Sequence, residues 1–247
     1  MNDFLKININ SQFAVIGDSH GCYYEFKELL EKIWENYGKD TFIISVGDNI
    51  DRGDYNLDTL NYCIELFEKG KFIEVQSNHM DKFVRWLKGN KVKVSYGLQK
   101  TVEEFQSLSI SLQEKLKEKI LNYWEKLPLY IIVNGDTIIA HAGIKDEYIG
   151  KKDKEVRSFV LYGAITGKFL ENGFPERLDW TKWRKLDEKS PKIIYGHQVF
   201  EEPYVNNRAY GIDTGCVLGN KLTAYLPKLD KFEFVKAKKQ YYSFAVK

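Results

Sequence analysis

The sequence has few cysteines, few prolines and no long hydrophobic run. Its 247 residues include five prolines and three cysteines, at positions 22, 63 and 216. The cysteines are odd in number, far apart and outside Cys-x-x-Cys spacing, which argues against a disulfide framework and against a zinc–thiolate site. We interpret them as reduced thiols of a cytoplasmic protein. No apolar run reaches membrane-spanning length, and the first residues lack the apolar core of a signal peptide, so no membrane partner is expected.

A strong charge of either sign is also missing. The chain carries 37 Lys and Arg against 35 Asp and Glu, a net charge of +2. The overall balance therefore requires neither nucleic acid nor an anionic membrane as a partner, and we infer no obligate protein partner. Hydrophobic residues make up 43% of the chain, which is ordinary for a soluble globular protein. This length and composition predict a single domain over residues 1–247.

Strand-like and helix-like segments alternate along the chain. Short apolar runs rich in β-branched and aromatic residues predict strands at 13–16, 41–46, 72–75, 130–133, 137–140, 192–195 and around 210–212. Apolar residues at three- and four-residue spacing predict helices over about 26–37 and 57–67. This rhythm is typical of an α/β core, and we interpret residues 81–127 as a helical insertion in it.

The C-terminal half is less regular. Residues 151–189 give no clear pattern, although Trp180 and Trp183 are expected to cover the core. The last thirty residues alternate in polarity and predict antiparallel strands. Residues 240–247 are predicted to form a loose tail.

Polar motifs follow several of the predicted strands, and all four histidines of the chain lie in them. The motifs are Gly17-Asp18-Ser19-His20-Gly21, Gly47-Asp48-Asn49-Ile50-Asp51-Arg52-Gly53, Ser77-Asn78-His79, His141-Ala142-Gly143 and Gly196-His197-Gln198. A single histidine is usually structural, and the second motif alone could be a solvated turn with a local Asp51–Arg52 ion pair. If the strands share one sheet, however, their carboxyl ends converge and the imidazoles can meet.

The side chains in these motifs favour a metal centre. Imidazole and carboxylate together suit Mn, Fe, Zn and similar ions. The candidate ligands are more than one ion needs: Asp18, His20, Asp48, Asn78, His141 and His197. This number favours two divalent ions with a bridging carboxylate, about 3.5–4 Å apart, which serve in-line displacement at phosphorus by an activated hydroxide. Arg52 would then bind the phosphate, and His79 is the candidate general acid for the leaving oxygen.

The ordered series Gly-Asp-x-His-Gly, Gly-Asp-x-x-Asp-Arg-Gly, Asn-His, His-Ala-Gly and Gly-His resembles the calcineurin-like metallophosphoesterase superfamily, in its phosphoprotein-phosphatase-type branch. Within that branch the likeness is greatest to the phosphatase domain of bacterial polynucleotide kinase–phosphatase and to small diadenosine-tetraphosphatase-like phosphatases. Residues 96–102, 156–163 and 212–216 extend it over nearly the whole chain. The resemblance implies a two-layered β-sandwich flanked by helices.

The resemblance also implies roles for particular residues. Asp18 and His20 would hold one ion, Asn78, His141 and His197 the other, and Asp48 would bridge them. Manganese is the expected metal, with iron, nickel or zinc as alternatives. Asp213 would stand close behind the site with a catalytic role. Arg177 is a candidate for substrate binding beside Arg157, Arg184 and Lys145, although each of these is individually more typical of an ordinary surface charge.

Two positions depart from the family's pattern. Ser77 replaces the usual glycine before Asn-His, and Met80 replaces the acid after it. That acid is expected to orient the histidine and strengthen it as a proton donor. Its loss predicts reduced activity toward poor leaving groups, with the metal ligands intact.

Three functions remain open at this point. The first is hydrolysis of a nucleotide-type substrate, either a dinucleoside tetraphosphate or a terminal or 2′,3′-cyclic phosphate on RNA. The second is a protein Ser/Thr or Tyr phosphatase with the same metal core, although residues 75–80 depart from the Leu-Arg-Gly-Asn-His-Glu pattern of eukaryotic protein phosphatases. The third, a degenerate fold kept for binding, is disfavoured because every proposed ligand is present.

Overall fold

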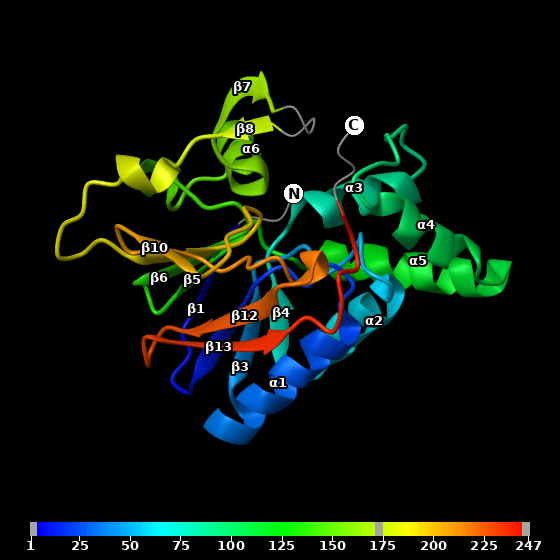
Figure 1. Cartoon of the computed structure of the whole chain (residues 1–247), viewed down its shortest axis with the longest axis horizontal. Coiled ribbons are helices and arrows are strands. Elements are labelled where there is room, and N and C mark those ends of the chain that lie inside the picture. Colours follow the sequence, from blue (N-terminus) through cyan, green and yellow to red (C-terminus); the bar gives the residue numbers. More distant parts are fainter. Residues whose placement is uncertain (1–3, 171–174, 244–247) are drawn as a thin grey trace.

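Two β-sheets stacked on each other form the centre of the molecule, with helices against their outer faces (Figure 1). The computed structural model describes residues 4–170 and 175–243. One sheet has the strand order β1-β5-β6-β9-β11-β10 and the other the order β13-β12-β2-β3-β4. This is the two-layered α/β sandwich expected from the sequence.

The strands of the first sheet are β1 (Leu5–Ile7), β5 (Tyr130–Val133), β6 (Thr137–Ala140), β9 (Lys192–Tyr195), β10 (Tyr204–Asn206) and β11 (Ala209–Gly211). Those of the second are β2 (Phe13–Ile16), β3 (Phe42–Ser45), β4 (Phe72–Glu74), β12 (Lys221–Leu226) and β13 (Lys231–Lys236). A separate pair consists of β7 (Ile165–Phe169) and β8 (Pro175–Arg177). Strands β2, β3 and β4 run parallel, as do β6, β9 and β11, so each sheet presents several carboxyl ends at one edge.

The alternation of side chains along β2 explains the layers. Phe13 and Val15 enter the apolar cluster between the sheets, whereas Ala14 and Ile16 pack with Phe26 of a covering helix. The helices are α1 (Tyr23–Tyr37), α2 (Asn56–Glu68), α3 (Asn78–Leu87), α4 (Leu98–Gln106), α5 (Ile110–Trp124) and α6 (Lys154–Tyr162). Helix α1 covers the second sheet and α6 the first. Three short 3₁₀ turns are η1 (Asp146–Tyr148), η2 (Trp180–Trp183) and η3 (Cys216–Leu218).

The predicted helical insertion is confirmed. Helices α3, α4 and α5 share an apolar cluster with α2, in which Leu60, Phe83 and Phe105 are almost fully buried. The insertion therefore packs on α2 at one end of the sandwich (Figure 1) and places the first turn of α3 directly after β4. That position puts Asn78 and His79 at the sheet edge.

Several details differ from the sequence-based expectation. Residues 240–243 are not a loose tail, because the backbone N–H groups of Tyr241 and Tyr242 both donate to the Val217 carbonyl at 3.0 Å. The remainder of that predicted tail, residues 244–247, lies outside the described residues. Trp180 is buried as expected, but Trp183 is 49% exposed and lies beneath the Lys145 ammonium group instead of covering the core. Strands β1 and β10 were not predicted.

Candidate metal centre and its pocket

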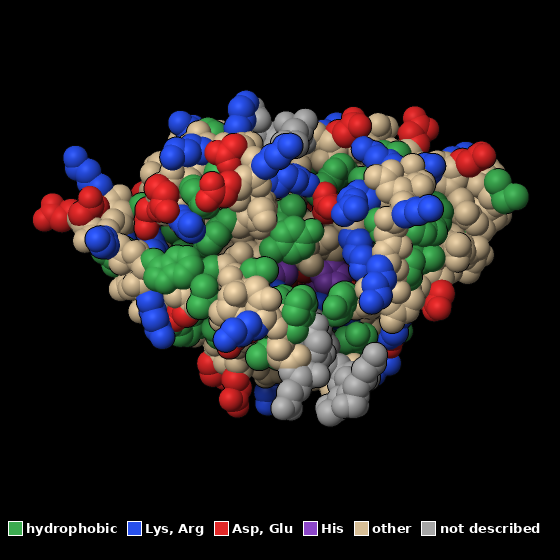
Figure 2. Space-filling view, turned by 90° about the horizontal axis from the view of Figure 1, so that it is seen from above, with side chains coloured by type: hydrophobic (Ala, Val, Ile, Leu, Met, Phe, Trp, Pro, Cys, Tyr) green, Lys and Arg blue, Asp and Glu red, His purple; other side chains and the backbone are tan. Residues whose placement is uncertain are grey.

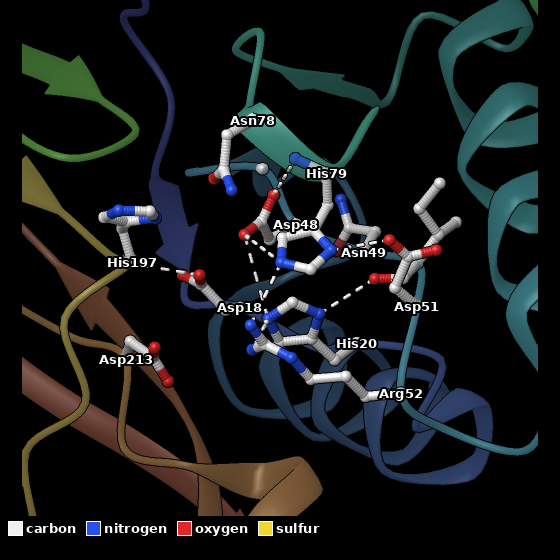
Figure 3. A network of polar contacts seen from close by, with 12 residues as sticks. Asp18, His20, Asp48, Asn49, Asp51, Arg52, Asn78, His79, His197 and Asp213 are labelled. Carbon is white, nitrogen blue, oxygen red and sulfur yellow. Dashed lines mark hydrogen bonds and ion pairs between the residues drawn. The ribbon is translucent and has the colours of Figure 1, made fainter. Parts of the chain in front are cut away.

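The predicted ligands meet at the carboxyl ends of strands from both sheets (Figure 3). Asp18 and His20 follow β2, Asp48 follows β3, and Asn78 begins α3 after β4. His141 and His197 follow β6 and β9, which belong to the other sheet. The strands do not share one sheet, the condition under which the sequence analysis expected the imidazoles to meet. The ligands converge because the parallel strands of both layers end at the same edge of the sandwich.

Four ligand atoms face one another around His141. Its Nε2 lies 2.7 Å from Asn78 Oδ1, 3.0 Å from His197 Nδ1 and 3.4 Å from Asp48 Oδ2. The other ring nitrogen, Nδ1, donates to the Val46 carbonyl at 2.8 Å, which leaves Nε2 as the nitrogen whose lone pair can bind a metal ion. Lone pairs of oxygen and nitrogen aimed at one point repel each other unless a cation lies between them. This is the chemistry of a metal site.

A second group of ligands shares Asp48. His20 Nδ1 donates to the Ile50 carbonyl at 2.8 Å, which leaves its Nε2 3.8 Å from Asp48 Oδ2. Asp18 Oδ2 accepts from the backbone N–H of His197 at 3.0 Å. Asp18 Oδ1 is buried and meets no hydrogen-bond partner among the residues that the structure describes. A Cβ atom at Gly196 would lie 1.8 Å from this oxygen, so only glycine leaves room for the carboxylate.

The electrostatics of the centre also call for cations. Asp18, Asp48 and Asp213 are all 3% exposed or less. Burial, followed by the neighbouring Asp213 and Asp48, holds the pKa of Asp18 well above its usual range. Burial also raises the pKa of Asp213 to about 6, although its carboxylate accepts from the Gly215 N–H at 3.0 Å. A divalent ion would compensate this cluster of buried carboxylates.

The histidines match that requirement. Burial, with Arg52 second, lowers the pKa of His20 well below its usual range, and burial beside His141 does the same for His197. Both rings are therefore neutral, the form that binds metal ions. Burial alone would raise the pKa of Asp48, but His141 and His79 outweigh it and keep this carboxyl ionised. The residues thus fit two divalent ions that share Asp48.

Arg52 and His79 lie beside the ligands. Arg52 Nη1 donates to His20 Nε2 at 2.7 Å, and its Nη2 donates to His79 Nε2 at 3.0 Å. Residues of the helical insertion also hold Arg52 in place. Its Nε donates to the Tyr96 carbonyl, and its backbone N–H donates to the Gly97 carbonyl. Arg52 therefore lies between the candidate ligand His20 and the candidate general acid His79, where it can contact a phosphoryl group.

One functional residue, Asp51, was missed by the sequence analysis. Its Oδ2 lies 2.5 Å from His79 Nδ1, and its Oδ1 accepts from Thr101 Oγ1 of α4 at 2.5 Å. Asp51 is fully buried and orients the ring so that Nε2 faces the open side of the centre. Its place in the Gly47–Gly53 motif was the available signal, but it pairs with His79 and not with the adjacent Arg52.

Asp51 corrects the expectation that His79 lacks an orienting acid. Met80, which stands where the family has that acid, is 3% exposed and packs in the apolar cluster of the insertion with Phe83 and Leu98. A carboxylate there would be buried among apolar side chains without a partner. Methionine at this position therefore serves packing, while the carboxylate on His79 comes from a different motif.

The backbone at the centre is strained. Five residues other than glycine have left-handed backbone angles: His20 (φ 44°), Asp48 (φ 49°), Asp51 (φ 74°), Arg52 (φ 73°) and His197 (φ 66°). Each such residue costs on the order of 1–3 kcal/mol, and strain of this kind concentrates at functional sites. The surrounding fold holds the side chains in these positions.

A pocket of about 720 Å³ opens directly onto the centre. Asp48, Asn78, His79, His197 and Arg52 form its inner end. Figure 2 shows histidine side chains at the bottom of a hollow, with Lys and Arg side chains gathered along one side of it. The remaining lining residues are Lys82, Arg85, Lys91, Val92, Lys93, Tyr96, Tyr162, Leu170, Pro175, Arg177, Gln198 and Val199.

Among the other predicted cations, only Arg177 belongs to this described lining. It donates to the Tyr162 carbonyl at 2.7 Å. Arg184 is 7% exposed and bonds Asp146 in a structural role. Arg157 bonds Gln76 and Asp81, and Lys145 lies over the Tyr148 ring.

The three cysteines are free and buried, as expected, and no described helix is long and apolar enough to cross a membrane.

Comparison with known proteins agrees with this centre. Residues 11–230 match the calcineurin-like phosphoesterase family. The chain is 42% identical to the asymmetrical bis(5′-nucleosyl)-tetraphosphatase PrpE of Oceanobacillus iheyensis, over 90% of each chain. It is 37% identical to the PrpE of Bacillus subtilis, over 86% of this chain and 89% of that one. Fold and site together define a metallophosphoesterase, a hydrolase of phosphate esters or anhydrides. The chain belongs to the calcineurin-like phosphoesterase family.

Solved structures share the fold. A candidate diadenosine tetraphosphatase superposes with a TM-score of 0.69 at 18% identity, over 96% of this chain and 99% of that chain. A cold-active protein-tyrosine phosphatase from a Shewanella species gives a TM-score of 0.57 at 15% identity, over 94% of this chain and 83% of that one. At these identities the likeness shows the architecture alone.

Proposed function

We propose that the protein is a binuclear metal-dependent phosphoesterase that hydrolyses dinucleoside tetraphosphates asymmetrically, to a nucleoside triphosphate and a nucleoside monophosphate. The pocket carries this proposal. Of its seventeen described lining residues six are Lys or Arg and one, Asp48, is acidic. A long polyanion fits such a lining better than a single phosphoryl group does. The relatives named as asymmetrical tetraphosphatases, at 37–42% identity, support the same substrate class.

In this proposal each candidate residue has a role. One ion would be held by Asp18, His20 and Asp48, and the other by Asp48, Asn78, His141 and His197. The ions, when bound, lower the pKa of the attacking water and neutralise charge on the phosphoryl oxygens. The donor set of imidazole, carboxylate and amide oxygen favours manganese, with iron, nickel or zinc as alternatives.

The chain's own groups do the remaining work. Arg52 binds the phosphoryl group under attack, and Arg177 binds another part of the phosphate chain. His79, oriented by Asp51, gives a proton to the leaving oxygen. Asp213 stands close behind the site, where its buried carboxyl adds to the negative charge around Asp18. We also propose a cytoplasmic location, which the three free buried cysteines support.

The test is identification of the products that metal-stripped, manganese-restored protein forms from a matched set of substrates. The matched substrates are diadenosine tetraphosphate, an aryl phosphate, RNA with a 2′,3′-cyclic or 3′-phosphate end, and a phosphopeptide. We expect hydrolysis of the tetraphosphate well above that of the phosphopeptide, yielding ATP and AMP, and its loss in Asp48→Ala. Preference for the phosphopeptide would instead establish the protein-phosphatase alternative, and preference for an RNA end would name another nucleotide-type substrate.

A further inference from the structure

One wall of the pocket is a row of cations that begins next to His79. Lys82 and Arg85 follow His79 at three-residue spacing on α3, so the three side chains form one ridge of that helix. The ridge rises about 9 Å from position 79 to position 85. Lys91 and Lys93, on the segment after α3, extend the same wall. The cations are thus arranged along a line and not scattered over the surface.

The first cation of this row is fixed in place. Lys82 Nζ donates to both the carbonyl and the hydroxyl oxygen of Ser95 at 3.2 Å, and it lies 5.5 Å from the centre of the Tyr96 ring. Among the residues that the structure describes, Arg85 has one acidic neighbour, Asp81, at 3.8 Å, but Asp81 is bound more closely by Arg157 at 2.7 Å. The Arg85 side chain is 49% exposed. Both groups therefore keep positive charge available to an anion in the pocket.

The facing wall has a different character. Its residues lie at the end of α6, around β7–β8 and after β9, which are elements outside the helical insertion (Figure 1). Tyr162, Leu170 and Val199 on this wall are 43–48% exposed, and Arg177 is its one described cation. Apolar and aromatic side chains open to the pocket suit a ribose and base, whereas the α3 wall suits a chain of phosphates. The pocket is therefore polarised in charge, although Val92 and Tyr96 add apolar surface on the α3 side as well.

The unequal charge of the two walls determines the direction of cleavage, that is, which phosphorus is attacked and which part of the substrate leaves. In an in-line displacement, the attacking water and the leaving oxygen lie on opposite sides of the phosphorus. The leaving oxygen must lie at His79, which protonates it, and the ridge of cations starts at that point. We propose that the leaving group is the nucleoside triphosphate, whose phosphates run along His79, Lys82 and Arg85. The phosphorus under attack then carries the other nucleoside, which faces the apolar wall.

The bonds formed and broken follow from this placement. The oxygen of water forms a new bond to the phosphorus that carries one nucleoside, and the anhydride bond from that phosphorus to the triphosphate breaks. The bridging oxygen leaves with the triphosphate and takes a proton that His79 carries at Nε2 once Arg52 Nη2, which donates to that atom here, binds the phosphoryl group instead. The oxygen atom of water therefore ends in the monophosphate. This inference rests on the proposed tetraphosphatase activity.

Hydrolysis in ¹⁸O-labelled water tests the direction. The manganese-restored protein is incubated with diadenosine tetraphosphate, and mass spectrometry locates the label in the products. We expect the label in AMP and none in ATP. Label in ATP would overturn the direction while leaving the tetraphosphatase activity intact. Two molecules of ADP, or no hydrolysis, would instead overturn the proposed function itself, and with it this inference.

A pair of variants tests the ridge. Lys82→Gln with Arg85→Gln removes two charge-assisted contacts to the leaving phosphates. The ratio of kcat/KM for diadenosine tetraphosphate to kcat/KM for an aryl phosphate should fall by about tenfold or more. The control, Lys115→Gln with Lys117→Gln, removes the same charge from the exposed face of α5 and should leave the ratio unchanged. An unchanged ratio in the first pair, or an equal fall in the control, would refute the ridge as the phosphate subsite.

Discussion

Asp51 connects the candidate general acid to the helical insertion. Its carboxylate receives Thr101 Oγ1 on one oxygen and His79 Nδ1 on the other. Thr101 lies fifty positions from Asp51 along the chain. Residue patterns within one motif cannot show this contact, because it depends on how α4 packs. The position of the insertion therefore matters for catalysis as well as for the shape of the pocket.

Replacing Asp51 should affect substrates according to their leaving groups. Asp51→Asn removes the carboxylate that accepts from His79 Nδ1, so the ring is no longer held with Nδ1 as the donor and Nε2 toward the leaving oxygen. A general acid contributes about 10²- to 10⁴-fold to rate when the leaving oxygen needs a proton. We expect kcat for an alkyl phosphate to fall roughly a hundredfold, and kcat for p-nitrophenyl phosphate to fall much less.

A neighbouring carboxylate provides the control. Asp54→Asn removes an acid that contacts Lys100 at 2.8 Å, outside the pocket lining. Asp54→Asn should leave the ratio of kcat for the alkyl phosphate to kcat for p-nitrophenyl phosphate unchanged. If Asp51→Asn slowed both substrates equally, Asp51 would have a structural role and not one in orienting His79.

Glu74 is a buried acid that the proposed reaction does not use. It is 2% exposed at the end of β4, and its Oε2 accepts from Asn49 Nδ2 at 2.5 Å. Burial raises the pKa of Glu74 from 4.5 to about 7. Between these values the folded protein keeps a proton that the unfolded chain has lost. The contribution of Glu74 to stability therefore decreases as pH rises through this window and is lowest above pH 7.

Glu74→Gln should remove this pH dependence, since an amide keeps the oxygen that Asn49 contacts and cannot ionise. We expect the free energy of unfolding of the variant, relative to the wild type, to rise by about 2–3 kcal/mol between pH 5 and pH 8. Urea unfolding at both pH values measures it. An exposed acid on α4, Glu103→Gln, controls for the loss of one charge. If the free energy of unfolding of the variant relative to the wild type stayed constant from pH 5 to pH 8, Glu74 would not titrate in this range.

At the scale of secondary structure, the elements follow from sequence more directly than their contacts do. The strands at 13–16, 72–75 and 192–195 are predictable because each is short, apolar and followed by glycine or a polar motif. Strand β1 has three residues and pairs only with β5, so its pattern is too short to detect. The docking of residues 240–243 was missed for another reason. Their backbone bonds the Val217 carbonyl of a distant turn, and a local pattern does not encode that contact.

The α4 N-terminus shows how an element positions a catalytic side chain. Gly97 precedes α4 with φ 97°, and a Cβ there would lie 2.3 Å from Arg52 Cγ. Gly97→Ala should therefore displace Arg52 and lower kcat/KM for an aryl phosphate by about tenfold or more, the loss of one charge-assisted contact. Gly89→Ala is the matched control, because Gly89 also has a positive φ, 80°, but has no atom within 4 Å of the added Cβ. Equal activity in the two variants would contradict the role of Gly97 in holding Arg52.

At the scale of the whole molecule, the candidate metal centre joins the two sheets. Asp18 and Asp48 come from one sheet, and His141 and His197 come from the other. An ion held by both sets would tie the layers together at their shared edge. Ions that bind only the folded state stabilise it by about 2.7 kcal/mol at a hundredfold excess over Kd. For a chain of this size that corresponds to a rise in Tm of roughly 5–10 °C.

Asp18→Asn should separate the stability of the metal-free protein from the gain due to metal. The substitution removes one of three clustered buried carboxylates, and an amide oxygen can still accept from the His197 N–H. Without metal, the variant should therefore unfold at the same temperature as the wild type or higher, because less like charge is buried. With manganese added, its rise in Tm should be clearly smaller, because one ion has lost a charged ligand. Calorimetry with and without chelator measures both quantities. A variant that is less stable without metal, yet keeps the full rise with manganese, would rule out Asp18 as a ligand.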